Sequence, residues 1–274
     1  MYFAFVLLGV IALLGIRWFY RAINHLDPNE PAYTGNFAVV DPQPAEELTV
    51  VSYNISYGRK LDQALAELGK FQLQRTLDIL LLQEMEEAGV ERMARQLQMN
   101  YIYFPATVEP KYRRNFGNAV LTRWPIAGSQ KLILPHISLS DQMKRVATRA
   151  IIRVQNEEVV AYSIHTEPVF IWPKFKEEQC LAVLKDEGSQ ARFVIAGGDF
   201  NSFTQMYVEK LENRYGQAGF VRASKGIGYT FGRFGLHMFP DQIFTKGFAV
   251  KAAGKLAEAN ASDHLPVWAA LIRK

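Results

Sequence analysis

The 274-residue sequence predicts an α/β protein in which two sheets pack together and helices cover their outer faces. In the first half of the chain, short apolar runs rich in β-branched residues alternate with segments of helical spacing. Later runs follow one another closely, as the strands of antiparallel hairpins do. Hydrophobic residues make up 49% of the chain, which is enough for the sizeable core that such a fold needs.

The chain begins with an apolar segment. Met1 to Ile16 contains no charged side chain, and an aromatic cluster flanked by two arginines follows, ending at Arg21. Because about twenty helical residues span a bilayer core, residues 1–21 are predicted to be a single-pass transmembrane anchor, with residues 1–20 in the membrane. No Lys or Arg precedes the run and no cleavage pattern follows it, which favours an anchor over a signal peptide or a buried soluble helix. The arginines on its carboxyl side point to the cytoplasm, but two charges leave the side of the membrane open.

Residues 22–47 are predicted to be a linker, because prolines with polar neighbours recur through them. Residues 1–47 hold two Arg and five acidic residues, so residues 48–274, the predicted folded domain, hold 29 basic and 22 acidic side chains, a formal charge of +7. This charge suits an anionic substrate or a membrane surface and does not distinguish them. The single cysteine, Cys180, excludes an intrachain disulfide framework and is expected to be a small buried hydrophobe.

The expected elements of residues 48–274 are of two kinds. Apolar, β-branched runs are expected to be the strands Val50–Tyr53, Ile79–Leu82, Asn118–Thr122, Thr148–Val154, Glu158–His165, Phe193–Ala196, Gln242–Thr245, Phe248–Ala252 and Val267–Ile272. Apolar residues at helical spacing are expected to form the helices Leu61–Leu77, Val90–Leu97, Pro173–Leu184 and Gln205–Asn213. No repeat of fixed period interrupts this pattern.

Polar side chains stand at the ends of five of the apolar runs. Asn54, Glu84, His165 and Asp199 come where a strand ends, and Asp263-His264 comes just before the last strand. Strands of one sheet bring their ends together, so these residues are expected to share one cleft. Carboxylate and amide oxygens suit a hard divalent cation, and the remaining donors suit a phosphoryl oxygen.

The string Gly197-Gly198-Asp199-Phe200-Asn201 is the most specific of these features. Glycines after a buried strand allow a turn with positive φ, and the spacing places Asp199 and Asn201 on the same side. An Asp can take a proton from water or bind a metal, while an Asn amide can donate to a phosphoryl oxygen. The alternative is an Asx turn that caps the next helix. Glu84 is a candidate Mg²⁺ ligand, with a helix N-terminal acid as its alternative.

Two histidines have settings that suit catalysis. Asp241, at the start of a strand, can accept a hydrogen bond from one ring nitrogen of His264, which would fix the tautomer and favour the imidazolium. His165 ends its own strand and can donate to a phosphate oxygen.

These motifs occur in a characteristic order. They are Asn54, Gln83-Glu84, Gly117-Asn118-Ala119-Val120-Leu121, His165, Gly198-Asp199-Phe200-Asn201, Asp241 and Ser262-Asp263-His264-Leu265-Pro266-Val267. Over about residues 48–272 the chain resembles the endonuclease/exonuclease/phosphatase superfamily, which includes deoxyribonuclease I and the neutral sphingomyelinases. The resemblance implies a four-layered α/β/β/α sandwich with two mixed sheets, and hydrolysis of a phosphoester with Mg²⁺, for which Mn²⁺ is an alternative ion.

The resemblance also implies a metal set and the residue that activates water. Glu84 would be the principal metal ligand, with Asn54 beside it and Asp263 near the metal. Asp199 would orient or deprotonate the attacking water. Whether one metal or two act is left open by the resemblance.

The remaining roles that the resemblance implies belong to hydrogen-bond donors. Asn201 would hold the phosphoryl oxygen. His165 and His264, the latter oriented by Asp241, would stabilise the pentacovalent phosphate or assist the leaving oxygen. Donors aimed at oxygens whose charge grows in the transition state are effective in catalysis. Two lesser candidates for substrate contacts are Arg149 and Asn118, and the alternative for Arg149 is a solvated strand charge.

The substrate is less well determined. Where exonuclease III-like enzymes carry a Trp-Trp-Ser-Tyr-Arg type segment, residues 229–241 differ, which disfavours abasic-site repair. The basic loop Lys111–Arg114 is compatible with nucleic acid, any polyanion or plain solvation. Apolar loops at Val169–Trp172 and Phe231–Phe239, beside the predicted site, favour a lipid surface unless they pack on the sandwich edges.

Three hypotheses follow from these features. The first is a membrane-tethered, Mg²⁺-dependent phosphodiesterase or phosphatase that acts on a lipid-linked or small phosphoester, with no obligate protein partner. The second is a metal-dependent nuclease acting on DNA or RNA, and the third is a non-catalytic binding module of the same fold. A nucleotide-binding loop is excluded, because neither a Walker-type Gly-Lys-Ser/Thr nor a strand-placed G-x-G-x-x-G occurs.

Overall fold

The computed structural model describes residues 21–38, 46–138, 141–168, 173–233 and 236–274. The strands of the first sheet are β1 (Ile23–Asn24), β2 (Tyr33–Gly35), β3 (Glu47–Asn54), β4 (Ile79–Met85), β5 (Asn100–Val108), β6 (Asn115–Thr122), β15 (Phe248–Lys255) and β16 (Val267–Arg273). They lie in the order β1-β5-β6-β4-β3-β16-β15, and β2 also pairs with β5. Only β3 and β4 run parallel among the described pairs of this sheet, so it is mixed.

The second sheet has the order β11-β14-β10-β9-β8-β7. Its strands are β7 (Ile126–Ile133), β8 (Val146–Val154), β9 (Glu157–His165), β10 (Phe193–Asp199), β11 (Val221–Arg222) and β14 (Asp241–Lys246). β9 and β10 run parallel and their neighbours are antiparallel, so this sheet is mixed as well. A separate hairpin is formed by β12 (Phe231–Arg233) and β13 (Leu236–Met238).

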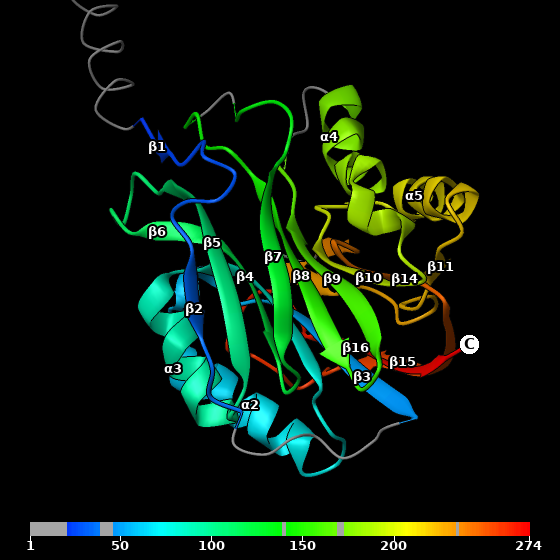
Figure 1. The fold of residues 1–274 in the computed structure, drawn as a ribbon. Helices are drawn as coiled ribbons and strands as arrows, with labels where there is room; N and C mark the ends of the chain where they lie inside the picture. Colours follow the sequence, from blue (N-terminus) through cyan, green and yellow to red (C-terminus); the bar gives the residue numbers. More distant parts are fainter. Residues whose placement is uncertain (1–20, 39–45, 139–140, 169–172, 234–235) are drawn as a thin grey trace, which may run out of the picture.

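Helices lie outside both sheets (Figure 1). The helical segments are η1 (Ser56–Gly58), α2 (Leu61–Gln72), α3 (Glu87–Leu97), α4 (Pro173–Cys180), η2 (Ala182–Lys185), η3 (Glu187–Gln190) and α5 (Gln205–Gln217). One apolar cluster fills the space between the sheets, a second lies under α2 and α3, and a third lies under α4 and α5. The predicted packing of two mixed sheets with helices outside is therefore confirmed, and Cys180 is buried in the third cluster as expected.

The local sequence explains why these elements form where they do. In α3, the apolar residues Val90, Met93, Ala94 and Leu97 recur at helical spacing and are all buried. Glu86 caps this helix, because its carboxylate accepts hydrogen bonds from two backbone N–H groups of the first turn. β10 is buried throughout and apolar up to its terminal Asp199, because the cluster between the sheets covers one face and the cluster under α4 and α5 covers the other.

The structure differs from the sequence predictions at several boundaries. α2 ends at Gln72 rather than Leu77, because the exposed Leu73 leaves the apolar stripe. Two of the longer strands, β5 and β7, were not predicted from the sequence, and neither were several short ones. In β5 the run is interrupted by Pro105, which lies at a register shift where a strand tolerates proline.

Part of the segment predicted to be a linker joins the first sheet. β1 and β2 both pair with β5, and the ring of Tyr33 packs against that of Tyr103 with centroids 5.8 Å apart. Short edge strands accommodate nearby prolines, which explains why linker-like composition is misleading here.

The predicted anchor, residues 1–20, and the apolar loop Val169–Trp172 lie outside the described residues. Within the residues that are described, no helix combines the length and the apolar character needed to cross a bilayer.

Candidate active site

The ends of strands from both sheets meet at one edge of the sandwich (Figure 1). Asn54 ends β3 and Glu84 lies near the end of the parallel strand β4. In the second sheet, Asp199 at the end of β10 is the register partner of His165 on β9 and of Asp241 on β14. The amide of Asn54 joins the two sheets, donating to Glu84 Oε1 at 3.2 Å and to Asp199 Oδ2 at 2.9 Å. Residues from Asn54 to Asp241, far apart in the chain, thus meet at one buried site, which is called the cleft below.

The backbone of the Gly-Gly-Asp-Phe-Asn string determines where Asp199 points. Gly198 has a φ of 151°, and a Cβ atom added there would lie 1.9 Å from the carbonyl oxygen of Ile164. Only glycine fits this position. Asp199 Oδ1 accepts a hydrogen bond from the backbone N–H of Asn201 at 2.7 Å, so an Asx turn is present, but the following helix is capped by Thr204 instead. The second carboxylate oxygen of Asp199 remains directed at the cleft, toward Asn54.

His264 stands between two buried carboxylates. Its Nδ1 lies 3.0 Å from Asp241 Oδ2, and its Nε2 lies 3.7 Å from Asp199 Oδ2. Thr230 donates to Asp241 Oδ2 at 2.6 Å and so holds the carboxylate that orients the ring. Burial alone would lower the pKa of His264, but the charges of Asp241 and Asp199 raise it to about 10. The side chain is therefore a cationic donor at neutral pH.

His165 has the opposite character. Burial, reinforced by the positive charge of Arg145, lowers the pKa of His165 to about 3, so the imidazole is neutral. Its Nε2 lies 3.6 Å from Asp199 Oδ2 and 3.9 Å from Glu84 Oε1. The guanidinium of Arg145 lies 3.4 Å from the ring nitrogens and is held by Glu167 at 2.7 Å. The permanent charge on this side of the cleft belongs to Arg145.

Glu84 is suited to hold a metal ion. Its backbone has a φ of 59° and its side chain is 17% exposed at the cleft. Burial raises the pKa of Glu84 above its ordinary value, although the nearby charge of His264 and the Asn54 hydrogen bond oppose this. A divalent cation would offset the cost of burying this carboxylate. Asn54 Oδ1 accepts a hydrogen bond from the backbone of Ser56 at 3.0 Å and has a second lone pair for a cation.

A second group of side chains also has the geometry of a metal site. One ligand atom from each of Asp199, Asp241 and His264 lies within 4.8 Å of the others. A cation bound there would have to displace the proton of His264, whose pKa the charges of Asp241 and Asp199 raise despite burial. The described residues thus offer two candidate positions for a cation, one at Glu84 and Asn54 and one at Asp199, Asp241 and His264.

Two of the residues predicted from the sequence, Arg149 and Asn118, lie elsewhere. Arg149 does not reach the cleft: its guanidinium is held at 2.7 Å by Asp186, on the helix-covered face of the second sheet. Asn118 is buried between the sheets, where its amide donates to the backbone carbonyls of Val146 and Ser163. Asp263, next to His264 in the chain, accepts a hydrogen bond from Ser262 at 3.4 Å and lines a pocket together with Ser56, so its predicted place near the metal stays a prediction.

Sequence reasoning missed Arg145, Tyr57 and Thr230. Tyr57 lies in η1, the short helical segment that begins two residues after Asn54. Its ring packs on Phe116, which in turn contacts His165. Burial and the nearby Glu84 raise the pKa of Tyr57, so it keeps its phenolic proton. Arg145 directly precedes β8, and this position beside a strand was the signal that could have found it.

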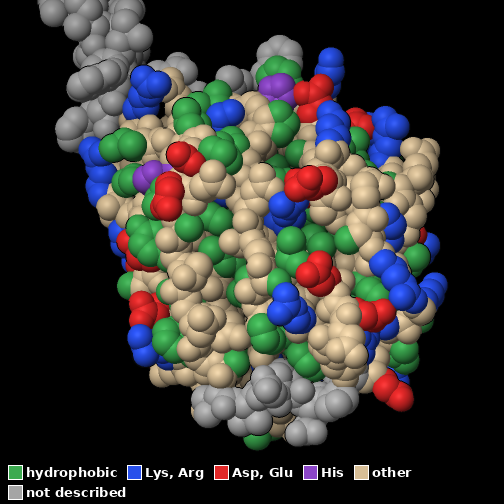
Figure 2. All heavy atoms as spheres, viewed as in Figure 1, with side chains coloured by type: hydrophobic (Ala, Val, Ile, Leu, Met, Phe, Trp, Pro, Cys, Tyr) green, Lys and Arg blue, Asp and Glu red, His purple; other side chains and the backbone are tan. Residues whose placement is uncertain are grey.

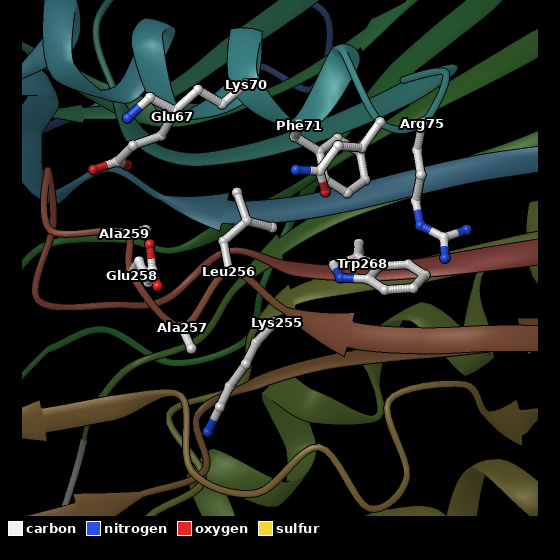
Figure 3. Close-up of a pocket in the computed structure, with 11 residues that line it drawn as sticks. Glu67, Lys70, Phe71, Arg75, Lys255, Leu256, Ala257, Glu258, Ala259 and Trp268 are labelled. Atoms are coloured by element: carbon white, nitrogen blue, oxygen red, sulfur yellow. The ribbon is translucent and has the colours of Figure 1, made fainter.

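On the face shown in Figure 2, basic and acidic side chains are interspersed among small hydrophobic areas. A pocket of about 330 Å³ lies along α2, away from the cleft, between Lys70 and Phe71 on one side and Leu256 and Trp268 on the other (Figure 3). The guanidinium of Arg75 covers the ring of Trp268 there, 4.3 Å from its centroid.

The model of the Endonuclease/Exonuclease/phosphatase family matches residues 51–264, a span that includes all of the converging residues. The chain belongs to this family. Members of the family hydrolyse phosphoesters and depend on a divalent metal ion. A search of curated proteins gave no match.

Solved structures of family members share the fold. An endonuclease/exonuclease/phosphatase from Bacteroides vulgatus has 18% identity and a TM-score of 0.66, covering 83% of this chain and 99% of that chain. TDP2 of D. rerio, humanized by 14 mutations, has 16% identity and a TM-score of 0.66, with the same coverage. A mannosyl-6-phosphatase from Bacteroides thetaiotaomicron has 18% identity and a TM-score of 0.61, covering 82% and 99%. At these identities the likeness concerns the fold.

Proposed function

We propose that the protein is a Mg²⁺-dependent phosphoesterase that hydrolyses a lipid-linked or small phosphoester by attack of water on phosphorus. The observation that carries this proposal is the position of Asp199. Its carboxylate faces Asn54 at 2.9 Å, next to the metal-binding Glu84, and His264 at 3.7 Å, held by Asp241. A base, a cationic donor and a metal ligand therefore surround one buried point, as phosphoester hydrolysis requires.

Each group has a distinct part in the proposed reaction. A divalent cation held by Glu84 and Asn54 would act as a Lewis acid toward a phosphoryl oxygen. Asp199 orients the water and accepts its proton, because the charge of His264 holds the pKa of Asp199 below its ordinary value even though burial alone would raise it. The carboxylate is thus fully ionised at neutral pH. Asn201 and His264 donate to the phosphoryl oxygens.

The side chain of Asn201 is positioned for this donation. Its amide nitrogen gives one hydrogen to the carbonyl of Thr166 at 2.6 Å, which leaves the second hydrogen for a substrate oxygen. Its backbone has a φ of 49° and is held by Asp199 at 2.7 Å. His165, neutral and backed by Arg145, supplies a further donor from the opposite side.

The test is hydrolysis by the full chain in detergent, with bis-p-nitrophenyl phosphate, p-nitrophenyl phosphate and mixed phospholipid vesicles as substrates. Each is run with Mg²⁺, with EDTA and with the variant Asp199→Asn. The matched control is Asp62→Asn, whose carboxylate is 82% exposed on α2. We expect turnover that requires both the metal and Asp199. Activity that survives EDTA or Asp199→Asn would contradict the proposal.

A second candidate function, a nuclease, is favoured by one observation. Tyr112 and Arg114 of the basic loop 111–114 lie beside Tyr57 and Glu84, where they line a small hollow together. Basic and aromatic side chains next to a metal ligand suit a nucleic-acid backbone and its bases. Degradation of plasmid DNA faster than any phospholipid or small ester, with loss on Arg114→Gln, would favour this function over the first.

We further propose that residues 1–20 tether the enzyme to a membrane, and that it acts without an obligate protein partner. The sequence of that segment and an apolar hairpin beside the site support the tether. Phe231 on β12 bridges to His264, and Leu236 on β13 is 62% exposed. Membrane fractions washed with carbonate should retain the full chain and lose a chain lacking residues 1–20. Equal release of both would contradict the tether.

A further inference from the structure

A pocket of about 300 Å³ opens directly beside the proposed active site. Its walls come from the segment after β3 and from the segment before β16, and they are formed by Ser56, Arg59, Lys60, Asn260, Ser262 and Asp263. The first wall is fixed to the site because the backbone of Ser56 donates to Asn54 at 3.0 Å. The second wall is fixed because Ser262 Oγ accepts a hydrogen bond from the backbone of His264 at 3.2 Å.

The pocket has an excess of positive charge at its mouth. Arg59 and Lys60 are both exposed, and within the described part of the chain neither is paired with a carboxylate. Arg59 donates to the hydroxyl and the carbonyl of Ser56, and Lys60 donates to the carbonyl of Asn260 at 3.0 Å. These neutral acceptors orient the two cations without neutralising them. A single carboxylate, Asp263, lies in the same wall.

The pocket is also of the right kind for a part of the substrate. It adjoins the residues that would bind the metal and the reacting phosphate, so one molecule can occupy both places. By contrast, the pocket in Figure 3 lies further along α2 and carries Glu67 and Glu258 together with its cations. Its aromatic ring is already covered by Arg75. Of the two, only the pocket beside Asn54 opens next to the site.

We propose that this pocket is an anion subsite that binds a second phosphate group of the substrate. The phosphoester held at Asp199 and Glu84 is hydrolysed, while Arg59 and Lys60 bind the second phosphate. The proposal rests on the proposed function, since it names the class of substrate that the site accepts. Guanidinium and ammonium groups that already have fixed geometry bind phosphate oxygens through charge-assisted hydrogen bonds. A small bisphosphate and the adjacent phosphate of a nucleic-acid strand share this chemistry.

The subsite can be tested by binding, without relying on turnover. Calorimetry in EDTA compares fructose 1,6-bisphosphate with fructose 6-phosphate on the full chain in detergent, and a short deoxythymidine oligonucleotide represents the other source of a second phosphate. We expect the bisphosphate or the oligonucleotide to bind roughly tenfold more tightly than the monophosphate, as one charge-assisted contact provides. The double variant Arg59→Gln, Lys60→Gln should abolish this difference. Glutamine keeps a hydrogen-bond donor for Ser56 and Asn260, so the walls are retained while the charge is removed.

Two further variants make the result specific. Arg59→Lys, which keeps the charge, should retain most of the difference. Lys70→Gln, on the helix α2 that follows the two cations but outside the subsite, should retain all of it. Equal affinity for bisphosphate, oligonucleotide and monophosphate in the unaltered chain, or a difference that survives the double variant, would overturn the proposal. A difference in binding without hydrolysis of any phosphoester would support the subsite and refute the proposed function instead.

Discussion

The conformation of Gly198 gives the most direct test of how the fold positions Asp199, the proposed base. The φ of 151° at Gly198 is one that residues with a side chain rarely adopt. The Cβ of Gly198→Ala would lie 1.9 Å from the carbonyl oxygen of Ile164 and 2.7 Å from its nitrogen. Ile164 is the register partner of Gly198 in the parallel pair β9 and β10, so the clash is with the backbone of the neighbouring strand. No rotation of a side chain can relieve it.

The cost can be worked out from these contacts. Forcing a residue with a Cβ into this backbone region costs about 1–3 kcal/mol. Moving β9 away from β10 by about 1 Å would break one or two ladder hydrogen bonds, each worth about 1 kcal/mol. We therefore expect Gly198→Ala to lower the free energy of unfolding by about 2–5 kcal/mol. The same displacement would move Asp199 away from Asn54, so the remaining folded protein should also lose activity.

Urea unfolding of the detergent-solubilised chain measures this cost. Variants at two other glycines, Gly197 and Gly216, serve as controls. At Gly197 the nearest atom to an added Cβ is a side-chain methyl of Leu81, 2.7 Å away, which can rotate, so Gly197→Ala should cost only about 1–2 kcal/mol. Gly216 on α5 has no atom within 4 Å, so Gly216→Ala should be neutral or stabilising by up to about 1 kcal/mol. Equal losses for Gly197→Ala and Gly198→Ala would refute the reasoning.

Three other predictions follow from the site and its surroundings. Glu84→Gln should raise the Mg²⁺ concentration needed for half-maximal activity by about 10- to 100-fold, measured by metal titration, because the amide lacks the charge that attracts the cation. Arg149→Gln should lower the free energy of unfolding by about 3 kcal/mol, because Asp186, whose side chain is 11% exposed, loses its cation, while kcat/KM stays unchanged. A large loss of kcat/KM without destabilisation would instead return Arg149 to the active site. Burial lowers the pKa of Lys176 to about 8 in the folded protein. Between about pH 8 and pH 10 the unfolded chain therefore keeps the Lys176 proton more than the folded protein does, and the free energy of unfolding should rise with pH. Urea midpoints across this range should show the rise in the unaltered chain and not in Lys176→Met.

The apolar runs of the sequence predicted the buried strands because their signal is local. β3, β4, β9 and β10 are covered on both faces, so each appears as a continuous run whose polar end marks the rim. β7 is only partly buried and lacks that signal, while β5 is interrupted by Pro105. Which rims meet could not be derived from the runs alone, because it depends on strand order and on how the sheets are stacked.

The assignments of Arg149 and Arg145 show the same limit at single residues. Side chains alternate between the faces of a strand, and in β8 the even-numbered Thr148, Ala150 and Ile152 face the core between the sheets or lie buried near it. Arg149 therefore faces the helix layer, where Asp186 holds it. The sequence does not identify the inward face, because Ile151 is apolar too. Arg145 reaches His165 only because β9 lies beside β8, and that contact depends on tertiary packing.

The directions of the site residues depend on backbone conformations that the sequence does not reveal. Ser56, Tyr57, Glu84 and Asn201 all have positive φ values, between 44° and 63°, although none is glycine. Each such residue costs on the order of 1 kcal/mol or more and persists only where the surroundings enforce it. Here the surroundings are the two sheets: Asn54 holds Ser56 and Glu84, and Asp199 holds Asn201. Because Asn54 also donates to Asp199, one amide connects the strained segments on the two sides of the cleft. The strained backbone lowers stability at the cleft, and it directs carboxylates and donors from separate sheets toward one point. The strained segment after Asn54 leads directly into Arg59 and Lys60, the cations that we assign to the second phosphate.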